Sequence, residues 1–154
     1  MAALLIALVA LGVAVGSWFR TASDSKPTPA APPVTYSQQQ ITDAKASVCA
    51  AYQQVRKAGD MAGARSGGSD PNAVLTVATS TRQVLDVGSR YLMTKLAKEP
   101  ATPPDLAAAV RKLADVYQEM TVDYLDGLSN SDPELDPLLR AGDEAHSTIE
   151  SLCK

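Results

Sequence analysis

Aromatic residues and histidine are scarce in this chain of 154 residues, and basic residues are not in excess. The sequence contains one Trp, one Phe, five Tyr and one His, and it has 14 Lys and Arg against 17 Asp and Glu. Binding of nucleic acid requires a basic face, and neither the charge balance nor the spread of charges along the chain provides one. We therefore predict that nucleic acid is not a partner.

The sequence also lacks the motifs on which most enzyme and metal-site classes depend. It contains no phosphate-binding loop, dinucleotide fingerprint, nucleophile elbow, CxxC pair or His/Cys cluster. The lone His146 is interpreted as a surface or boundary residue of a helix. The acidic run of Asp132, Glu134 and Asp136 lacks the glycine and terminal Glu of a calcium loop, and it is interpreted as helix N-terminal charge. We predict no enzymatic activity, no cofactor and no metal site.

Among the features that are present, the first is an uncharged apolar run over residues 2–19, followed by Arg20. As a helix it would span about 27 Å, close to the roughly 30 Å of a bilayer core. Trp18 and Phe19 beside Arg20 are typical of a membrane interface. A buried core helix is a poor alternative because no face of the run is polar. We predict a transmembrane anchor over residues 1–20, in contact with the membrane through residues 2–19. A cleaved signal peptide is the stronger alternative, because Ala14-Val15-Gly16 offers small residues to a signal peptidase.

Residues 21–35 form a linker rich in Pro and Ala, a composition that cannot bury a core and favours extended polyproline II structure. The side of the membrane is a separate question, because two signals conflict. Arg20 and Lys26 follow the apolar run, and the positive-inside rule would keep the rest of the chain in the cytoplasm. The spacer and the two cysteines favour the outside. We expect a single-pass protein of the cytoplasmic membrane with an extracytoplasmic C-terminal domain. Basic residues encoded upstream of Met1 would remove the conflict.

Residues 36–154 read as four amphipathic helices, each bounded by residues that favour helix starts or stops. The first begins at the capping box of Ser37 and Gln40 and ends at Gly59. The others begin at Asp70-Pro71, at Thr102 as the cap over Pro103, and at Asp132-Pro133.

Apolar residues recur along these four segments at steps of three and four, the spacing of one helix face. No segment reads as a strand, so we predict an all-α fold, an antiparallel four-helix bundle. In the second segment the inward face comprises Val74, Val77, Leu85, Leu92 and Leu96. The tyrosines are interpreted as part of an Ala-rich core. The alternative is that they line a cavity for a lipid or haem-like ligand. These tyrosines are Tyr52, Tyr91, Tyr117 and Tyr124.

The two cysteines lie at the border of apolar faces on the first and last predicted helices. Cys49 and Cys153 would be neighbours in an antiparallel bundle, and in an oxidising compartment such a pair should form a disulfide. Closing a loop of about one hundred residues would contribute roughly 4 to 5 kcal/mol. The alternative is two unrelated buried thiols in a cytoplasmic protein.

Three short segments carry a resemblance to known proteins: SVCAAYQQVRKA (47–58), ATPPDLAAAVRKLA (101–114) and NSDPE (130–134). Together with the anchor, spacer and closing Leu-Cys, they resemble the alanine- and proline-rich single-pass membrane proteins of actinobacterial cell envelopes. The resemblance implies a place in the cell envelope and supplies neither an activity nor a binding residue. We expect a non-enzymatic module that binds an envelope protein or assists a membrane complex. The alternative is a carrier domain for a small molecule such as a lipid or haem.

Overall fold

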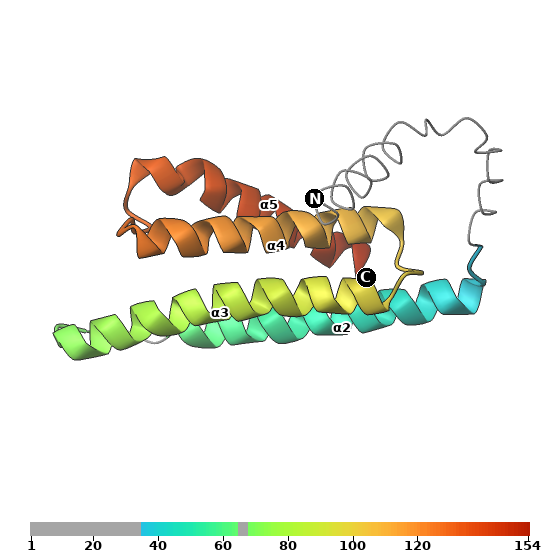
Figure 1. Cartoon of the computed structure of the whole chain (residues 1–154), viewed down its shortest axis with the longest axis horizontal. Helices are drawn as coiled ribbons and strands as arrows, with labels where there is room; N and C mark the ends of the chain where they lie inside the picture. Colours follow the sequence, from blue (N-terminus) through green and yellow to red (C-terminus); the bar gives the residue numbers. More distant parts are fainter. Residues whose placement is uncertain (1–34, 65–67) are drawn as a thin grey trace, which may run out of the picture. The chain divides into compact units, whose positions relative to one another are not determined.

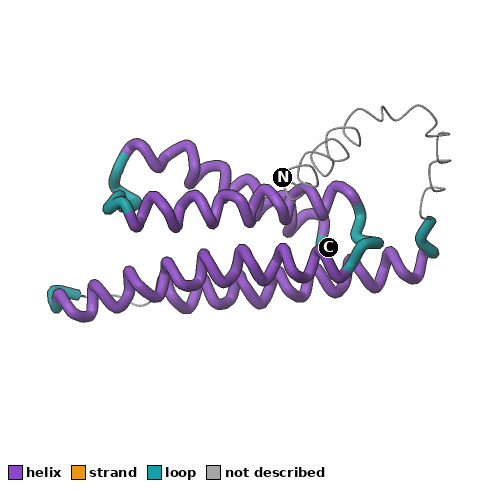
Figure 2. Tube along the Cα trace, in the orientation of Figure 1, coloured by secondary structure: helices purple, strands orange, loops and turns teal. Residues whose placement is uncertain are grey.

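The computed structural model describes residues 35–64 and 68–154. Residues 36–154 form one compact unit, and its described residues contain four α-helices and one short 3-10 helix. These are α2 (Gln38–Gly63), α3 (Pro71–Lys98), α4 (Pro104–Leu125), η1 (Pro133–Leu135) and α5 (Asp136–Leu152) (Figure 1). Figure 2 shows no strand in the described part of the chain. The prediction of an all-helical domain with four helices is therefore confirmed for these residues.

The predicted anchor over residues 1–20 and the linker up to residue 34 lie outside the described residues. Across residues 35–64 and 68–154, none of the helices combines the length and the hydrophobicity that a bilayer crossing requires.

Two helices begin as their sequence signals predict. At α2 the Ser37 hydroxyl accepts a hydrogen bond from the Gln40 backbone N–H at 3.2 Å, and the Gln40 side chain accepts one from the Ser37 N–H at 2.8 Å. This reciprocal pair is a complete capping box. At α3 the Asp70 carboxylate accepts from the Asn72 N–H at 3.0 Å, with Pro71 at the first helical position. Both caps satisfy backbone donors that the helix itself leaves unpaired.

Gly59 does not end the first helix, which continues one turn to Gly63. Gly59 has ordinary helical backbone, and Arg56 forms an ion pair with Asp60 at 3.5 Å across the expected break. Ala62 in the added turn is buried. Packing and an i,i+4 charge pair therefore outweigh the modest helix penalty of one glycine.

Thr102 is not the cap of α4, contrary to the sequence prediction. The cap is Pro103, and no side chain satisfies the first backbone donors of this helix. The Thr102 hydroxyl instead donates to the Glu99 carbonyl at 2.7 Å, which closes the preceding turn. The start of the fourth segment also differs, because Pro133 opens the short helix η1 and α5 begins only at Asp136.

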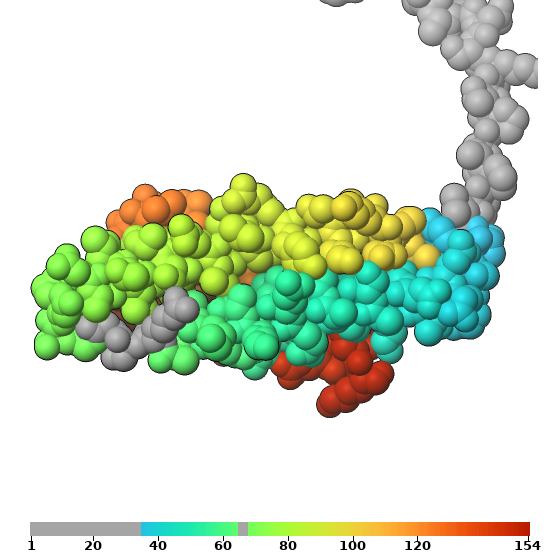
Figure 3. Space-filling view, turned by 90° about the horizontal axis from the view of Figure 1, so that it is seen from below, coloured from blue at the N-terminus to red at the C-terminus, as the bar shows by residue number. Residues whose placement is uncertain are grey.

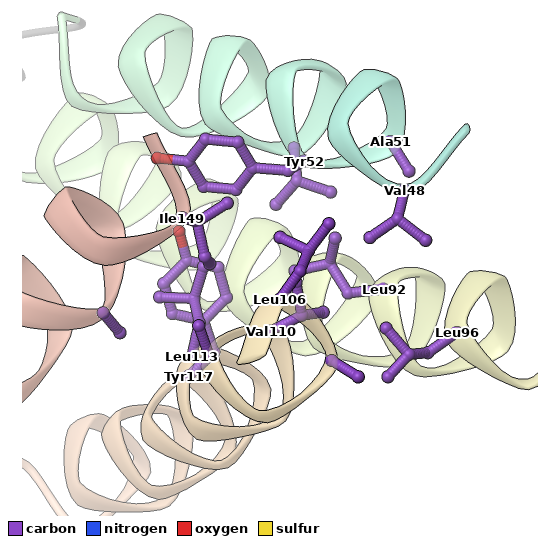
Figure 4. Close-up of a cluster of buried hydrophobic side chains, with 14 of the residues drawn as sticks. Val48, Ala51, Tyr52, Leu92, Leu96, Leu106, Val110, Leu113, Tyr117 and Ile149 are labelled. Atoms are coloured by element: carbon purple, nitrogen blue, oxygen red, sulfur yellow. The ribbon is translucent and has the colours of Figure 1, made fainter. Parts of the chain in front are cut away.

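The helices form two hairpins that pack on each other. Helix α3 packs against both α2 and α4, and α5 packs against α4 (Figure 1). Apolar side chains of all four helices form one core, in which Val48, Leu92, Val110, Leu113 and Ile149 are fully buried (Figure 4).

The predicted inward face of α3 is correct only in its C-terminal half. Leu85, Leu92 and Leu96 are buried, whereas Val74 is 50% exposed. The first turns of α3 therefore contribute little to the core.

Candidate functional site

An apolar groove runs between α2 and α3, the two helices that lie side by side on the face shown in Figure 3. Its volume is about 560 Å³. The residues that line it recur at steps of three and four along both helices, so the groove follows the helix axes. From α2 they are Gln54, Val55, Ala58, Met61 and Ala62, and from α3 they are Ser80, Gln83, Val84, Val87, Gly88 and Tyr91.

The groove is open to solvent, and two of its large apolar side chains are more exposed than buried. Met61 is 57% exposed and Val87 58% exposed. Its polar residues are uncharged, and the Tyr91 hydroxyl donates to the Gln54 side chain at 3.1 Å across the two helices. The groove thus presents apolar surface with a few hydrogen-bonding groups beside it.

Gly88 sets how closely α2 and α3 approach at the bottom of this groove. A Cβ atom at Gly88 would lie 2.8 Å from Cγ1 of Val55, well inside van der Waals contact. Only glycine fits there without movement of a buried β-branched side chain.

The second candidate site is a polar cluster around the single histidine, where α2, α4 and α5 meet. The Tyr52 hydroxyl lies 3.0 Å from Nδ1 of His146, and the Tyr117 hydroxyl lies 3.1 Å from Nε2. Figure 4 shows the hydroxyls of both tyrosines on the side of the apolar cluster where α5 lies. Tyr52 also donates to Glu150 at 3.2 Å and accepts from Arg56 at 3.2 Å. Arg56 in turn is paired with Glu150.

Hydrogen-bond accounting favours one tautomer of His146. The Tyr52 hydroxyl donates its hydrogen bond to Glu150, so the Tyr52 oxygen is left to accept hydrogen bonds from Nδ1–H of His146 and from Arg56. Nε2 then carries no proton and accepts from the buried Tyr117 hydroxyl. In this arrangement both tyrosine hydroxyls and the His146 N–H have an acceptor, as buried polar groups require.

Burial shifts the titration of this cluster. Burial, with the positive charge of Arg56 second, lowers the pKa of His146 from its ordinary value of 6.5, so the ring is neutral near pH 7. Burial also raises the pKa of Tyr52 and brings that of Tyr117 to about 12. Both tyrosines are therefore protonated donors under physiological conditions.

A pocket of about 400 Å³ opens beside this cluster. The residues that line it come from α2, α4 and α5, and carboxylates outnumber cationic groups among them. They are Arg56, Gly59, Asp60, Tyr117, Asp143, His146, Ser147 and Glu150.

The structure joins Cys49 and Cys153 by a disulfide, the pairing that the sequence analysis predicts. Their Cα atoms lie 5.7 Å apart, and the bond connects α2 to the end of α5. Both residues are half-buried.

The other residues singled out from the sequence have structural roles. Tyr124 is buried in the core and hydrogen-bonds to Asn130, and Tyr91 is half-buried beside the groove. Asp132 accepts hydrogen bonds from the backbone and hydroxyl of Ser129, which hold the pKa of its carboxyl below the ordinary value. No group of three or more His, Cys, Asp or Glu in residues 35–64 and 68–154 is arranged to hold a metal ion.

His146 is interpreted from the sequence as a surface or boundary residue, and the structure places it half-buried between two tyrosines. The 3- and 4-residue spacing identified Tyr52 and Tyr117 as inward-facing, but not that both hydroxyls meet one imidazole. The groove was not predicted, because Val87 and Met61 lie off the apolar stripes that mark the core.

Comparison with protein-family models, with curated proteins and with solved structures finds no match to this chain.

Proposed function

We propose that residues 36–154 are a non-enzymatic binding module, and that the groove between α2 and α3 receives an apolar segment of another protein. The observation that carries this proposal is the apolar groove of about 560 Å³ with Met61 and Val87 more than half exposed. Exposed apolar side chains grouped beside a groove are typical of protein-interaction surfaces.

The length of the groove suits a short helix. Its α3 side extends from Ser80 to Tyr91, about 16 Å along the helix axis. An amphipathic helix of about three turns would lie along it, with side chains at positions i, i+3, i+4 and i+7 on the apolar floor. Gln54 and Gln83 offer uncharged hydrogen-bonding groups to such a segment.

The location of the module rests on the sequence. An anchor over residues 2–19 and a Pro-rich spacer would hold the module at the cytoplasmic membrane, on its outer side. The resemblance to envelope proteins and the Cys49–Cys153 disulfide support this location, since disulfides persist in oxidising compartments. The partner would then be another envelope protein.

A small apolar ligand is the second candidate, and the groove volume favours it, because it falls in the range of small-molecule sites. Such sites enclose most of the ligand, whereas this groove is open along its length. We therefore favour a protein segment. Native mass spectrometry of the purified chain would show a bound apolar compound if the second candidate were correct.

A matched pair of charge substitutions tests the proposal. Val87→Asp places a charge in the groove, and Val122→Asp makes the same change at a helical valine of α4 outside it; the two valines are 58% and 57% exposed. After crosslinking in membranes, we expect Val87→Asp to lose the proteins recovered with the wild-type chain and Val122→Asp to retain them. Equal recovery with both variants, at equal helical content by circular dichroism, would refute the groove as the binding surface.

A further inference from the structure

Helices α2 and α5 face each other where the α2–α3 hairpin meets the α4–α5 hairpin, and we call this junction the seam. The backbones of the two helices hardly approach one another there. Helix α5 instead packs on α4, where Gly142 faces Val116. The seam is therefore held by side chains. This differs from the junctions of α3 with α2 and α4, which are packed along the helices.

Side-chain links cross the seam at about one position per turn of α2, and we call each link a rung. Lys45 donates to the backbone carbonyl of Lys154 at 3.3 Å, and Cys49 is bonded to Cys153. One turn further along α2 is Tyr52, which contacts His146 and Glu150. The last rung pairs Arg56 with Glu150.

The disulfide is the only covalent rung, and the others are individually weak. Arg56 and Glu150 have side chains 40% and 45% exposed, and such ion pairs contribute about 0 to 1 kcal/mol. A neutral hydrogen bond contributes about 1 kcal/mol net. The bond between Cys49 and Cys153 is therefore the strongest single link between α2 and α5, beside the apolar packing of Tyr52 and Ile149 in the shared core.

We propose that the Cys49–Cys153 disulfide is a redox latch: its reduction opens the seam between α2 and α5, and exposes Tyr52, Tyr117 and His146, while α3 and α4 stay folded. This inference does not depend on the groove between α2 and α3. Both cysteines are half-buried at the edge of the core and are not enclosed in it.

The reductant is a dithiol, such as the reduced active site of a thiol–disulfide oxidoreductase. One thiolate of the dithiol attacks one sulfur of the bridge, the Cys49–Cys153 bond breaks, and a mixed disulfide forms. The second thiolate attacks the reductant's own sulfur in the mixed disulfide and releases the remaining cysteine. Two electrons and two protons pass to Cys49 and Cys153, and the dithiol leaves as a disulfide.

The experiment uses the full chain, oxidised or reduced with dithiothreitol, and has two readouts. The pKa of His146, followed by NMR, reports burial of the seam. Amide exchange in α3 and α4 reports whether the rest of the domain stays folded. On reduction we expect the pKa of His146 to rise towards 6.5, with slow exchange retained in α3 and α4.

Two results would overturn the latch. An unchanged pKa of His146 with both thiols free would show that the remaining contacts keep the seam closed without the disulfide. Loss of slow exchange in α3 and α4 together with the seam would show that reduction unfolds the whole domain and does not open the seam separately. Cys49→Ser/Cys153→Ser serves as the control, since dithiothreitol should change neither readout in it. If this variant does not fold, the reduced native chain decides the question.

Discussion

At the scale of single residues, the environment of His146 decides its chemistry. Two tyrosines from different helices hold both ring nitrogens, and burial keeps the ring neutral. The sequence could place His146 on a boundary and the two tyrosines on inward faces. It could not show that they meet, because the contact depends on how α2 and α4 are placed relative to α5.

The stability of the domain should depend on pH through His146. Its pKa is lowered in the folded state, so the unfolded chain binds a proton more readily. The stabilisation is fully present above about pH 6.5 and is lost as the pH falls through the folded-state pKa. Urea unfolding between pH 8 and pH 5 should show this decline in the wild type and a flatter profile in His146→Gln. Identical profiles would contradict the burial of the neutral ring.

The Tyr117 hydroxyl should contribute measurably to stability. Tyr117→Phe leaves Nε2 of His146 without its donor in a buried site, and we expect a loss of about 1 kcal/mol. Tyr91→Phe is the matched control, because its hydrogen bond to Gln54 is exposed and its loss should cost less than about 0.5 kcal/mol. Urea denaturation measures both. Equal losses in the two variants would contradict the network.

At the scale of helices, local signals predicted the starts of α2 and α3, but not the cap of α4 or the start of α5. The Ser37 and Asp70 caps are formed by neighbouring residues, so they could be read from the sequence. The continuation of α2 past Gly59 depends on the burial of Ala62, which is set by contacts within the folded domain. The groove could not be predicted either, because it arises from the separation of α2 and α3, which Gly88 controls.

Two glycine substitutions in helices should have opposite effects. Gly59→Ala introduces a methyl group with nothing within 4 Å, so better helix propensity should stabilise the domain by about 0.5 to 1 kcal/mol. Gly88→Ala gains the same propensity but forces a contact with Val55, and overpacking of this kind costs about 1 to 3 kcal/mol. Thermal denaturation should therefore show a higher melting temperature for the first variant and a lower one for the second. Stabilisation by both would show that α2 and α3 can separate without cost.

At the scale of the whole domain, the disulfide joins two residues 104 positions apart and connects α2 to the end of α5. The sequence supported this pairing because helices one and four of an antiparallel bundle are neighbours. The sequence did not show that the backbones of α2 and α5 stay apart. Because they do, the disulfide contributes more to holding these two helices together than it would between closely packed helices.

Reduction of the bond should lower the free energy of unfolding by about 4 to 5 kcal/mol on the chain-entropy model. Urea unfolding with and without dithiothreitol measures this difference. A thiol assay on the unfolded, unreduced chain should detect no free thiol. Two reactive thiols in that assay would refute the disulfide.

The groove between α2 and α3 is proposed to hold a segment of another protein. Photocrosslinking in intact membranes tests it most directly, with a photoreactive amino acid in place of Val87, and in place of Val122 as the control. We predict that the Val87 position forms a crosslink to one apolar, helix-forming peptide of a different protein, identified by mass spectrometry, and that the Val122 position does not. Crosslinks to lipid alone, or the same products from both positions, would contradict the claim.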